Sequence, residues 1–221
     1  MIEQQINSVR IYTSIFLKIY DFLVLHIFGP YVWKCNVRHF TALYERFLSD
    51  DHADIGVGTG YFLDSCGGDV SAQKITLFDI NTNCLNYSTK RLKRYSPKAY
   101  VQHALSPFPM LEQKYSSICI GGLIHCLPGT MSTKCQVFDS LQTIAKEQSQ
   151  IFGYTLINAG MKKNFRAEFL MYMLNALKLI NNKNDSLEDL TNEISKRYSE
   201  YSVTKVGCMA FFSASKRKVI P

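Results

Sequence analysis

The sequence predicts an α/β fold in which helices cover both faces of a doubly wound, mostly parallel sheet. Short apolar, β-rich runs alternate with helical segments from residue 53 onward, and a glycine-rich turn follows the first run. Such alternation buries both faces of a parallel sheet. The length of 221 residues suits one large core. We expect a single domain, with a helical cap at 1–48 and a Rossmann-like core at 49–221.

The cap is expected to contain two helices. Residues 6–28 and about 36–48 read as helical, and Gly29-Pro30 separates them. The stretch 11–33 is the most apolar part of the chain. Lys18, Asp21 and His26 interrupt it, so it does not favour a transmembrane segment. An amphipathic helix packed on the domain is favoured over a membrane-surface anchor.

The core elements follow in alternation. The predicted strands are 53–57, 74–80, 99–104, 116–122 and 150–157. The predicted helices begin near Asn81-Thr82, run from about Thr130 to Lys146, cover 162–181, and begin again at Asp185 or Ser186. The closing stretch 201–216 reads as two strands joined near residue 207, which suits an antiparallel edge.

The charge and the cysteines limit the function classes. The chain has 25 Lys and Arg against 18 acids, for a formal net charge of +7. No aromatic residues are interleaved with its basic clusters as on a base-stacking platform, so a basic enzyme surface is favoured over a nucleic-acid partner. The seven cysteines are scattered singly without metal-site spacing. This spacing predicts no metal site. Because no secretory leader is recognisable, we also expect a reducing cytoplasm.

The turn DIGVGTG at 54–60 is the main functional signal. Gly56, Gly58 and Gly60 allow tight backbone conformations and a close approach by a ligand. A dinucleotide fingerprint would need its third glycine at Tyr61, and the Lys-Ser/Thr pair of a P-loop is absent. The spacing therefore does not favour a nicotinamide dinucleotide or a P-loop nucleotide.

Two acids accompany this turn. Asp54 opens it, where a carboxylate can face an ammonium group, and Asp79 ends the second strand, where it can accept hydrogen bonds from ribose hydroxyls. S-adenosylmethionine is a ligand that has an amino-acid end and a ribose but no pyrophosphate, so it matches these two acids.

With these residues the chain resembles the class I S-adenosylmethionine-dependent methyltransferases. The stretches YDFLVLHIFGPYVWKCN, GYFLD, LIHCLPG and FGYTLI resemble a subgroup of small methyltransferases associated with small-molecule, often secondary, metabolism. The resemblance covers about residues 20–160. It implies a seven-stranded, mostly parallel sheet with an antiparallel last strand, a helical lid, and S-adenosylhomocysteine as the product of the cofactor.

The resemblance also carries cofactor contacts over to matching positions. In the family the turn surrounds the methionyl part, and the acid after the second strand holds the ribose. An acid or amide often follows the third strand to bind adenine, whereas this chain has Gln102, His103 and Ala104, so the backbone or His103 is expected to substitute. The expected cofactor residues are Asp54, Gly56, Gly58, Gly60, Asp79, Ile80, His103, Ala104, Gly121 and Tyr20.

Methyl transfer is an in-line displacement, in which the enzyme holds the nucleophile and the methyl group collinear. Catalytic residues should therefore lie near the methyl group, at the end of the fourth strand. His125 lies there and suits a general base, although packing against the sheet or contact with the cofactor is an open alternative. Packing is likewise the alternative for the expected substrate pocket. Its candidate residues are Tyr12, His26, Tyr31, Trp33, Phe165 and Phe169.

The sequence thus predicts methyl transfer to a hydroxyl or amine, in preference to carbon or thiol, of a small aromatic or lipophilic metabolite. We expect a monomer or homodimer. A methyltransferase for RNA or DNA, and a non-catalytic scaffold subunit with the same fold, are the alternatives.

Overall fold

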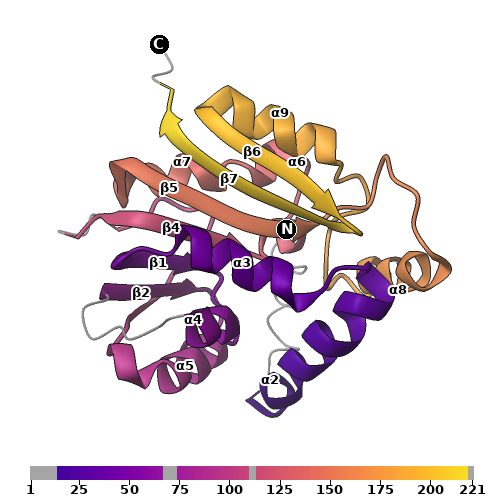
Figure 1. Ribbon diagram of the computed structural model, residues 1–221, viewed down its shortest axis with the longest axis horizontal. Helices are drawn as coiled ribbons and strands as arrows, with labels where there is room; N and C mark the ends of the chain where they lie inside the picture. The colour runs from indigo at the N-terminus through magenta and orange to yellow at the C-terminus, as the bar shows by residue number, and fades with distance from the viewer. Residues whose placement is uncertain (1–13, 67–73, 110–112, 219–221) are drawn as a thin grey trace.

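A seven-stranded sheet forms the centre of the computed structural model, which describes residues 14–66, 74–109 and 113–218 (Figure 1). Its strand order is β3-β2-β1-β4-β5-β7-β6. β7 pairs antiparallel with both of its neighbours, and the other pairings are parallel. The predicted sheet is confirmed. The strands are β1 (Asp51–Ile55), β2 (Lys74–Asp79), β3 (Lys98–Val101), β4 (Tyr115–Gly121), β5 (Ala145–Leu156), β6 (Tyr198–Val206) and β7 (Met209–Arg217).

Helices cover both faces of this sheet, and each face buries its own apolar cluster. On β5, Phe152 belongs to one cluster and its neighbour Ile151 to the other, because successive strand residues point to opposite faces. The helices of the Phe152 face are α3 (Val37–Phe47), α4 (Tyr61–Cys66) and α5 (Thr82–Arg91). Those of the Ile151 face are α6 (Met131–Lys134), α7 (Val137–Ser140) and α9 (Leu187–Arg197).

The N-terminal helices differ from the prediction. Helix α2 (Ser14–Asp21) continues directly into a π-helix, η1 (Phe22–Trp33), so the predicted break at Gly29-Pro30 is wrong. In η1 the Lys34 N–H bonds to the Gly29 carbonyl, five residues earlier. The wider π repeat accommodates Pro30, whose missing N–H removes a single hydrogen bond.

The end of η1 is fixed against the C-terminal hairpin. The Cys208 N–H donates to the Trp33 carbonyl at 2.8 Å. Gly207 has φ +58°, and a Cβ there would lie 2.0 Å from the same carbonyl oxygen. The Asn164 side chain donates to the Val32 carbonyl at 2.8 Å, at the start of α8 (Phe165–Ala176). The N-terminal helices therefore lie beside α8 and the hairpin (Figure 1).

The helix predicted from about Thr130 to Lys146 is also wrong as a continuous element. The chain forms α6, α7 and a 3₁₀ turn, η4 (Leu141–Thr143), and β5 begins at Ala145. The buried residues Met131, Val137, Phe138 and Leu141 have helical spacing, which explains the prediction. Helix α8 occupies the middle of the predicted 162–181 segment, with Asn164 as its N-cap. Two further 3₁₀ turns are η2 (Lys93–Tyr95) and η3 (Ile124–Cys126).

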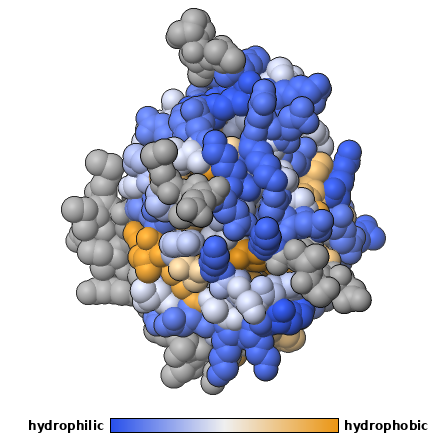
Figure 2. Space-filling view, turned by 90° about the vertical axis from the view of Figure 1, so that its left-hand side faces the viewer, coloured by the Kyte–Doolittle hydropathy of each residue, from blue (hydrophilic) through white to orange (hydrophobic). Residues whose placement is uncertain are grey.

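The strand directions define which side of the molecule can hold a site. Since antiparallel β7 ends on the left of Figure 1, the parallel strands begin there. The surface on that side is mostly hydrophilic, with limited apolar areas (Figure 2). Within the described part of the chain, no helix has the length and apolar character needed to cross a membrane.

A buried ion pair joins α6 to the segment between α8 and α9. Lys134 is fully buried, and its Nζ lies 2.6 Å from Asp185 Oδ2. The same ammonium donates to the Asn181 carbonyl. A buried cation needs such partners, because removal from water penalises the charge. The pair therefore positions residues 181–185 at the carboxyl end of the sheet.

We expect Lys134→Met to lower the free energy of unfolding by about 3–5 kcal/mol, because Asp185 would keep a buried charge without a partner. Urea denaturation at pH 7 measures the loss. The double variant Lys134→Met/Asp185→Leu removes both charges and should recover most of it. A single variant as stable as the parent protein would contradict this role.

Candidate active site

Two adjoining cavities lie at the carboxyl ends of the central strands, where open α/β sheets bind ligands. The first has a volume of about 120 Å³ and lies beside β2 and β3. The second, of about 360 Å³, lies between the sheet and the N-terminal helices. Gly56, Gly58, Gly122 and Cys126 line both cavities, so the glycine turn forms their common wall.

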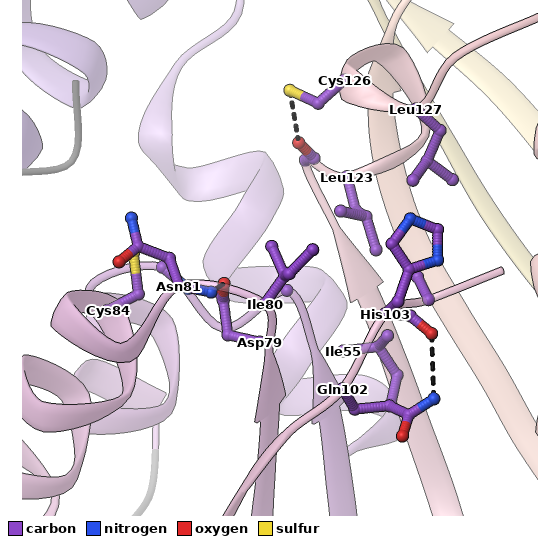
Figure 3. Close-up of a pocket in the computed structure, with 14 residues that line it drawn as sticks. Ile55, Asp79, Ile80, Asn81, Cys84, Gln102, His103, Leu123, Cys126 and Leu127 are labelled. Carbon is purple, nitrogen blue, oxygen red and sulfur yellow. Dashed lines mark hydrogen bonds between the residues drawn. The ribbon is translucent and has the colours of Figure 1, made fainter. Parts of the chain in front are cut away.

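Asp79 is the acidic group of the first cavity (Figure 3). Its Oδ1 accepts the Asn81 N–H at 2.8 Å, and its Oδ2 accepts the Gly58 N–H at 3.2 Å. Burial raises the pKa of Asp79 to about 6, and these two backbone donors offset part of the effect. An ionised carboxylate keeps further lone pairs for hydroxyl donors. Ile80, 42% exposed, lines the cavity beside it.

The opposite wall of the first cavity comes from residues after β3. Gln102 Nε2 donates to the His103 carbonyl at 3.0 Å and to the Ser106 carbonyl at 3.3 Å, so this amide is engaged within its own loop (Figure 3). His103 Nδ1 accepts the Leu105 N–H at 3.2 Å, and burial lowers the pKa of the ring. His103 and Ala104 both line the cavity.

Two glycines of the turn serve different purposes. Gly58 has φ +56°, and a Cβ there would have no heavy atom within 4 Å, so its backbone is open to a ligand. Gly60 has φ +70°, and a Cβ there would lie 3.1 Å from side-chain atoms of Ser88 and Leu92. Gly60 therefore allows α5 to pack closely, whereas Gly58 leaves space for the site.

Asp54 is one of two acids that line the second cavity, the other being Asp21, and it is only 3% exposed. The Tyr44 hydroxyl donates to its Oδ2 at 3.0 Å, and the Cys119 thiol donates to the Tyr44 oxygen at 3.1 Å. A Cβ at Gly121 would lie 3.2 Å from the Tyr44 oxygen and 3.1 Å from the Tyr154 ring, so glycine allows both tyrosines to approach without being displaced. Sequence reasoning missed Tyr44, whose position on an amphipathic helix indicates only burial.

The second cavity is largely aromatic and aliphatic. Its lining includes no lysine and no arginine within the described ranges. Tyr20 and Trp33 line it from the N-terminal helices, as predicted for a lid. Its other aromatic residues are Phe28, Phe40, Tyr44, Tyr61, Phe62 and Tyr154.

Asp21, Thr59 and Arg91 form a set of polar contacts, here called the clasp, that connects the lid helix α2 to the glycine turn. The Thr59 hydroxyl donates to Asp21 Oδ1 at 2.6 Å, and Arg91 Nη1 lies 2.8 Å from Asp21 Oδ2. The same guanidinium donates to the Thr59 carbonyl at 3.1 Å. Arg91 belongs to the basic run 90–94, and Arg94 of that run pairs with Asp64. Part of the basic cluster is thus used for internal contacts.

His125 lies in η3 at the edge of the second cavity and is 9% exposed. The Leu156 N–H donates to its Nδ1 at 3.2 Å, and the Thr155 hydroxyl lies 3.1 Å from the same nitrogen. Burial, with a smaller contribution from the Lys134 cation, lowers the pKa of His125 to about 3. The ring is therefore neutral at physiological pH.

Four of the remaining predicted pocket residues, His26, Tyr31, Phe165 and Phe169, line neither cavity. Tyr12 lies outside the described residues. His26 and Tyr31 are exposed on η1. Phe165 and Phe169, 79% and 57% exposed, stack on each other because α8 turns Ala167 and Met171 inward instead. Between residues 14 and 218, outside the gaps 67–73 and 110–112, no group of three or more His, Cys, Asp or Glu residues could hold a metal ion.

Comparison with known proteins places the chain in a family. It is 32% identical to the demethylluteothin O-methyltransferase of Streptomyces thioluteus, over 97% of this chain and 94% of the relative. It is 28% identical to a physcion biosynthesis cluster O-methyltransferase of Aspergillus chevalieri, over 96% of each chain. No protein-family model matches the chain.

Solved structures share the fold at low sequence identity. The complex of DhpI with S-adenosylhomocysteine has a TM-score of 0.63 and 14% identity, with 95% of each chain covered. An O-methyltransferase family protein from Burkholderia thailandensis has a TM-score of 0.61 and 8% identity. That match covers 81% of this chain, which spans only 56% of the Burkholderia chain.

The chain belongs to the class I S-adenosylmethionine-dependent methyltransferases, as its sequence motifs and fold predicted. Within that class its curated relatives are O-methyltransferases of secondary metabolism. The comparisons give no support to the nucleic-acid methyltransferase or to the scaffold subunit.

We expect the clasp to control opening of the lid. In Asp21→Asn or Arg91→Gln, loss of a partly buried charged hydrogen bond, worth about 1.5–3 kcal/mol, should speed amide hydrogen exchange in residues 14–33 by about tenfold or more. Mass spectrometry of the exchanged peptides measures the effect.

Arg94→Gln is the matched control, since Arg94 lies in the same basic run but pairs with Asp64 at an exposed position. It should leave exchange in the lid unchanged. The double variant Asp21→Asn/Arg91→Gln should exchange little faster than either single variant. Additive effects, or equal effects of Arg94→Gln, would show that the ion pair does not hold the lid.

Proposed function

We propose that the two cavities together bind S-adenosylmethionine, with its adenosine part in the first and its methionyl part in the second. The observation that carries this proposal is the common wall at Gly56 and Gly58, with Asp79 in the first cavity and Asp54 in the second. Asp79 would accept ribose hydroxyls, and Asp54 would face the ammonium group. The open position at Gly58 leaves room for a ligand against the backbone. Ile80, His103 and Ala104 would contact the adenine.

The proposed reaction is methyl transfer to an oxygen of a small, apolar, aromatic metabolite. When bound, the cofactor supplies an electrophilic methyl group on a positively charged sulfur. The aromatic and aliphatic lining of the second cavity would hold a flat acceptor and exclude water. The names of the curated relatives support oxygen as the acceptor atom.

The proposal also includes the location, the domain organisation and the oligomeric state of the enzyme. All seven cysteines are unpaired, which supports a reducing cytoplasm as its location. The cap at 1–48 and the core at 49–221 would act as one domain, since Tyr44 of α3 bonds to Asp54 of β1. A small-molecule acceptor is the proposed partner, and the protein would act as a monomer or homodimer.

The affinity for S-adenosylhomocysteine should depend on the ionisation of Asp79. With a pKa of about 6 in the free protein, the carboxylate is ionised at pH 7.5 and protonated at pH 5. Because the ionised form accepts more hydroxyl hydrogen bonds, affinity should hold above pH 7 and fall below pH 6, approaching tenfold per pH unit. Titration calorimetry between pH 5 and 8 measures the profile.

Asp79→Asn should bind about tenfold more weakly at pH 7.5 and lose most of the pH dependence. Asp64→Asn is the matched control, because Asp64 lies on the same side of the sheet but outside both cavities. An unchanged pH profile in Asp79→Asn would refute the assignment of the ribose contact to this residue.

The methyl transfer itself is tested with methyl-labelled cofactor and a metabolite extract of the source organism. We expect label in a small aromatic product, identified by mass spectrometry as a methyl ether. Label on nitrogen or carbon would contradict oxygen as the acceptor. Calorimetry that detects no binding of S-adenosylhomocysteine would refute the proposed cofactor site.

A further inference from the structure

The hydrogen bonds around His125 determine which ring nitrogen carries its proton. The Leu156 backbone N–H can only donate, and it points at Nδ1 over 3.2 Å. The Thr155 oxygen accepts the backbone N–H of His125 at 3.1 Å, which leaves its own hydrogen to donate to the same Nδ1. Nδ1 is therefore an acceptor, and the proton of a neutral ring resides on Nε2.

The second nitrogen faces the cavity. The ring lines the second cavity, and Nε2 has no protein partner among the described residues. Burial keeps the imidazole neutral, and the Lys134 cation, paired with Asp185, adds to this preference. A neutral ring of this tautomer presents an N–H donor to the cavity and turns its lone pair toward the backbone. It cannot take a proton from a substrate held at Nε2.

The carboxylates that line the second cavity are already engaged. Asp21 accepts from Thr59 and pairs with Arg91 in the clasp. Asp54 accepts from Tyr44 and belongs to the proposed methionyl end. Asp21 therefore belongs to the clasp and Asp54 to the ammonium group of the cofactor, so neither carboxylate is assigned to the acceptor hydroxyl.

Three further titratable groups of the lining hold their protons. Burial raises the pKa values of Tyr44 and Tyr154 well above that of an ordinary phenol. Burial also raises the pKa of the Cys126 thiol to about 12. With no lysine or arginine in the described lining, the cavity also offers no counter-ion for a carboxylate or phosphate substituent on the acceptor.

We propose that His125 acts as a hydrogen-bond donor to the acceptor oxygen, and that the site therefore selects an acidic hydroxyl, an enol or electron-poor phenol without other charges, which reacts as its oxyanion. This inference rests on the proposed O-methyl transfer. The Nε2–H would hold the oxyanion, and the positive sulfur of the cofactor would balance its charge.

The reaction balances without a base in the protein. The hydroxyl loses its proton to solvent before transfer. An oxygen lone pair then forms the bond to the methyl carbon, while the carbon–sulfur bond breaks and its electron pair stays on sulfur. The products are a neutral methyl ether and a neutral thioether, and no proton moves during the transfer.

The first test reads the tautomer with no ligand present. In ¹⁵N-labelled protein at pH 7, long-range ¹H–¹⁵N spectra should show His125 Nδ1 as the unprotonated nitrogen and Nε2 as the protonated one, with the signal assigned by its loss in His125→Gln. A ring protonated on Nδ1, or a doubly protonated ring, would overturn the proposal.

The second test measures binding of a probe. 4-Nitrophenol bound to the complex with sinefungin, an analogue whose ammonium group stands in for the charged sulfonium of the cofactor, should show the absorbance of the phenolate, and its apparent pKa should be lower than in water. His125→Ala should weaken phenolate binding by about ten- to hundredfold, the range for hydrogen bonds to charged groups. His125→Gln keeps an N–H donor and should lose less. His26→Ala is the matched control, since His26 is exposed outside both cavities, and should bind like the parent.

The third test compares acceptors of graded acidity, from an enolised cyclic 1,3-dicarbonyl through nitrophenols to phenol and benzyl alcohol. The pKa that appears in the pH profile of kcat/KM should change with the pKa of the hydroxyl of each acceptor. One limiting pKa shared by all acceptors and removed in His125→Gln would identify a protein base and overturn the inference, while O-methyl transfer itself would stand. No transfer to any acceptor, together with no binding of S-adenosylhomocysteine, would refute the proposed function but leave the tautomer result intact.

Discussion

The buried hydrogen bond between Tyr44 and Asp54 is the contact on which the arrangement of the site depends. A carboxylate at 3% exposure needs a donor, because an unpaired buried charge is strongly unfavourable. Tyr44 provides it from α3, and the tyrosine oxygen in turn accepts from Cys119 of β4. One polar chain therefore joins the N-terminal helices to two central strands and fixes the acid at the end of β1. The absence of a side chain at Gly121 makes the contact sterically feasible.

The parts of the fold that depend on local pattern were predictable from the sequence. The glycine turn, Asp54 and Asp79 predicted the cofactor class from their spacing and their chemistry, and strand–helix alternation predicted the sheet. Contacts between distant segments were not predictable: the bond from Tyr44, the buried pair at Lys134 and the donor from Leu156 all depend on tertiary packing. The direction of helix faces was ambiguous too. Because α8 is apolar around much of its surface, Phe165 and Phe169 looked equivalent to the residues that it buries.

Several arginines of this positively charged chain form contacts within the protein. Arg91 binds the lid, while Arg197 of α9 and Arg217 of β7 both bind Asp139 of α7. These cations act within the protein, whereas the lining of the second cavity carries none within the described ranges. The positive charge needed near the reacting oxygen would therefore come from the cofactor. This separation suits an uncharged, apolar acceptor.

The contact between Gly207 and the Trp33 carbonyl has a practical consequence. Trp33 is the only tryptophan of the chain, is 5% exposed and lines the second cavity. The hairpin turn holds the Trp33 backbone through Cys208 and so anchors this end of the lid. The protein therefore contains a built-in fluorescent reporter. Its emission spectrum would register occupancy of the cavity and movement of the lid in real time, without a label or an introduced chromophore.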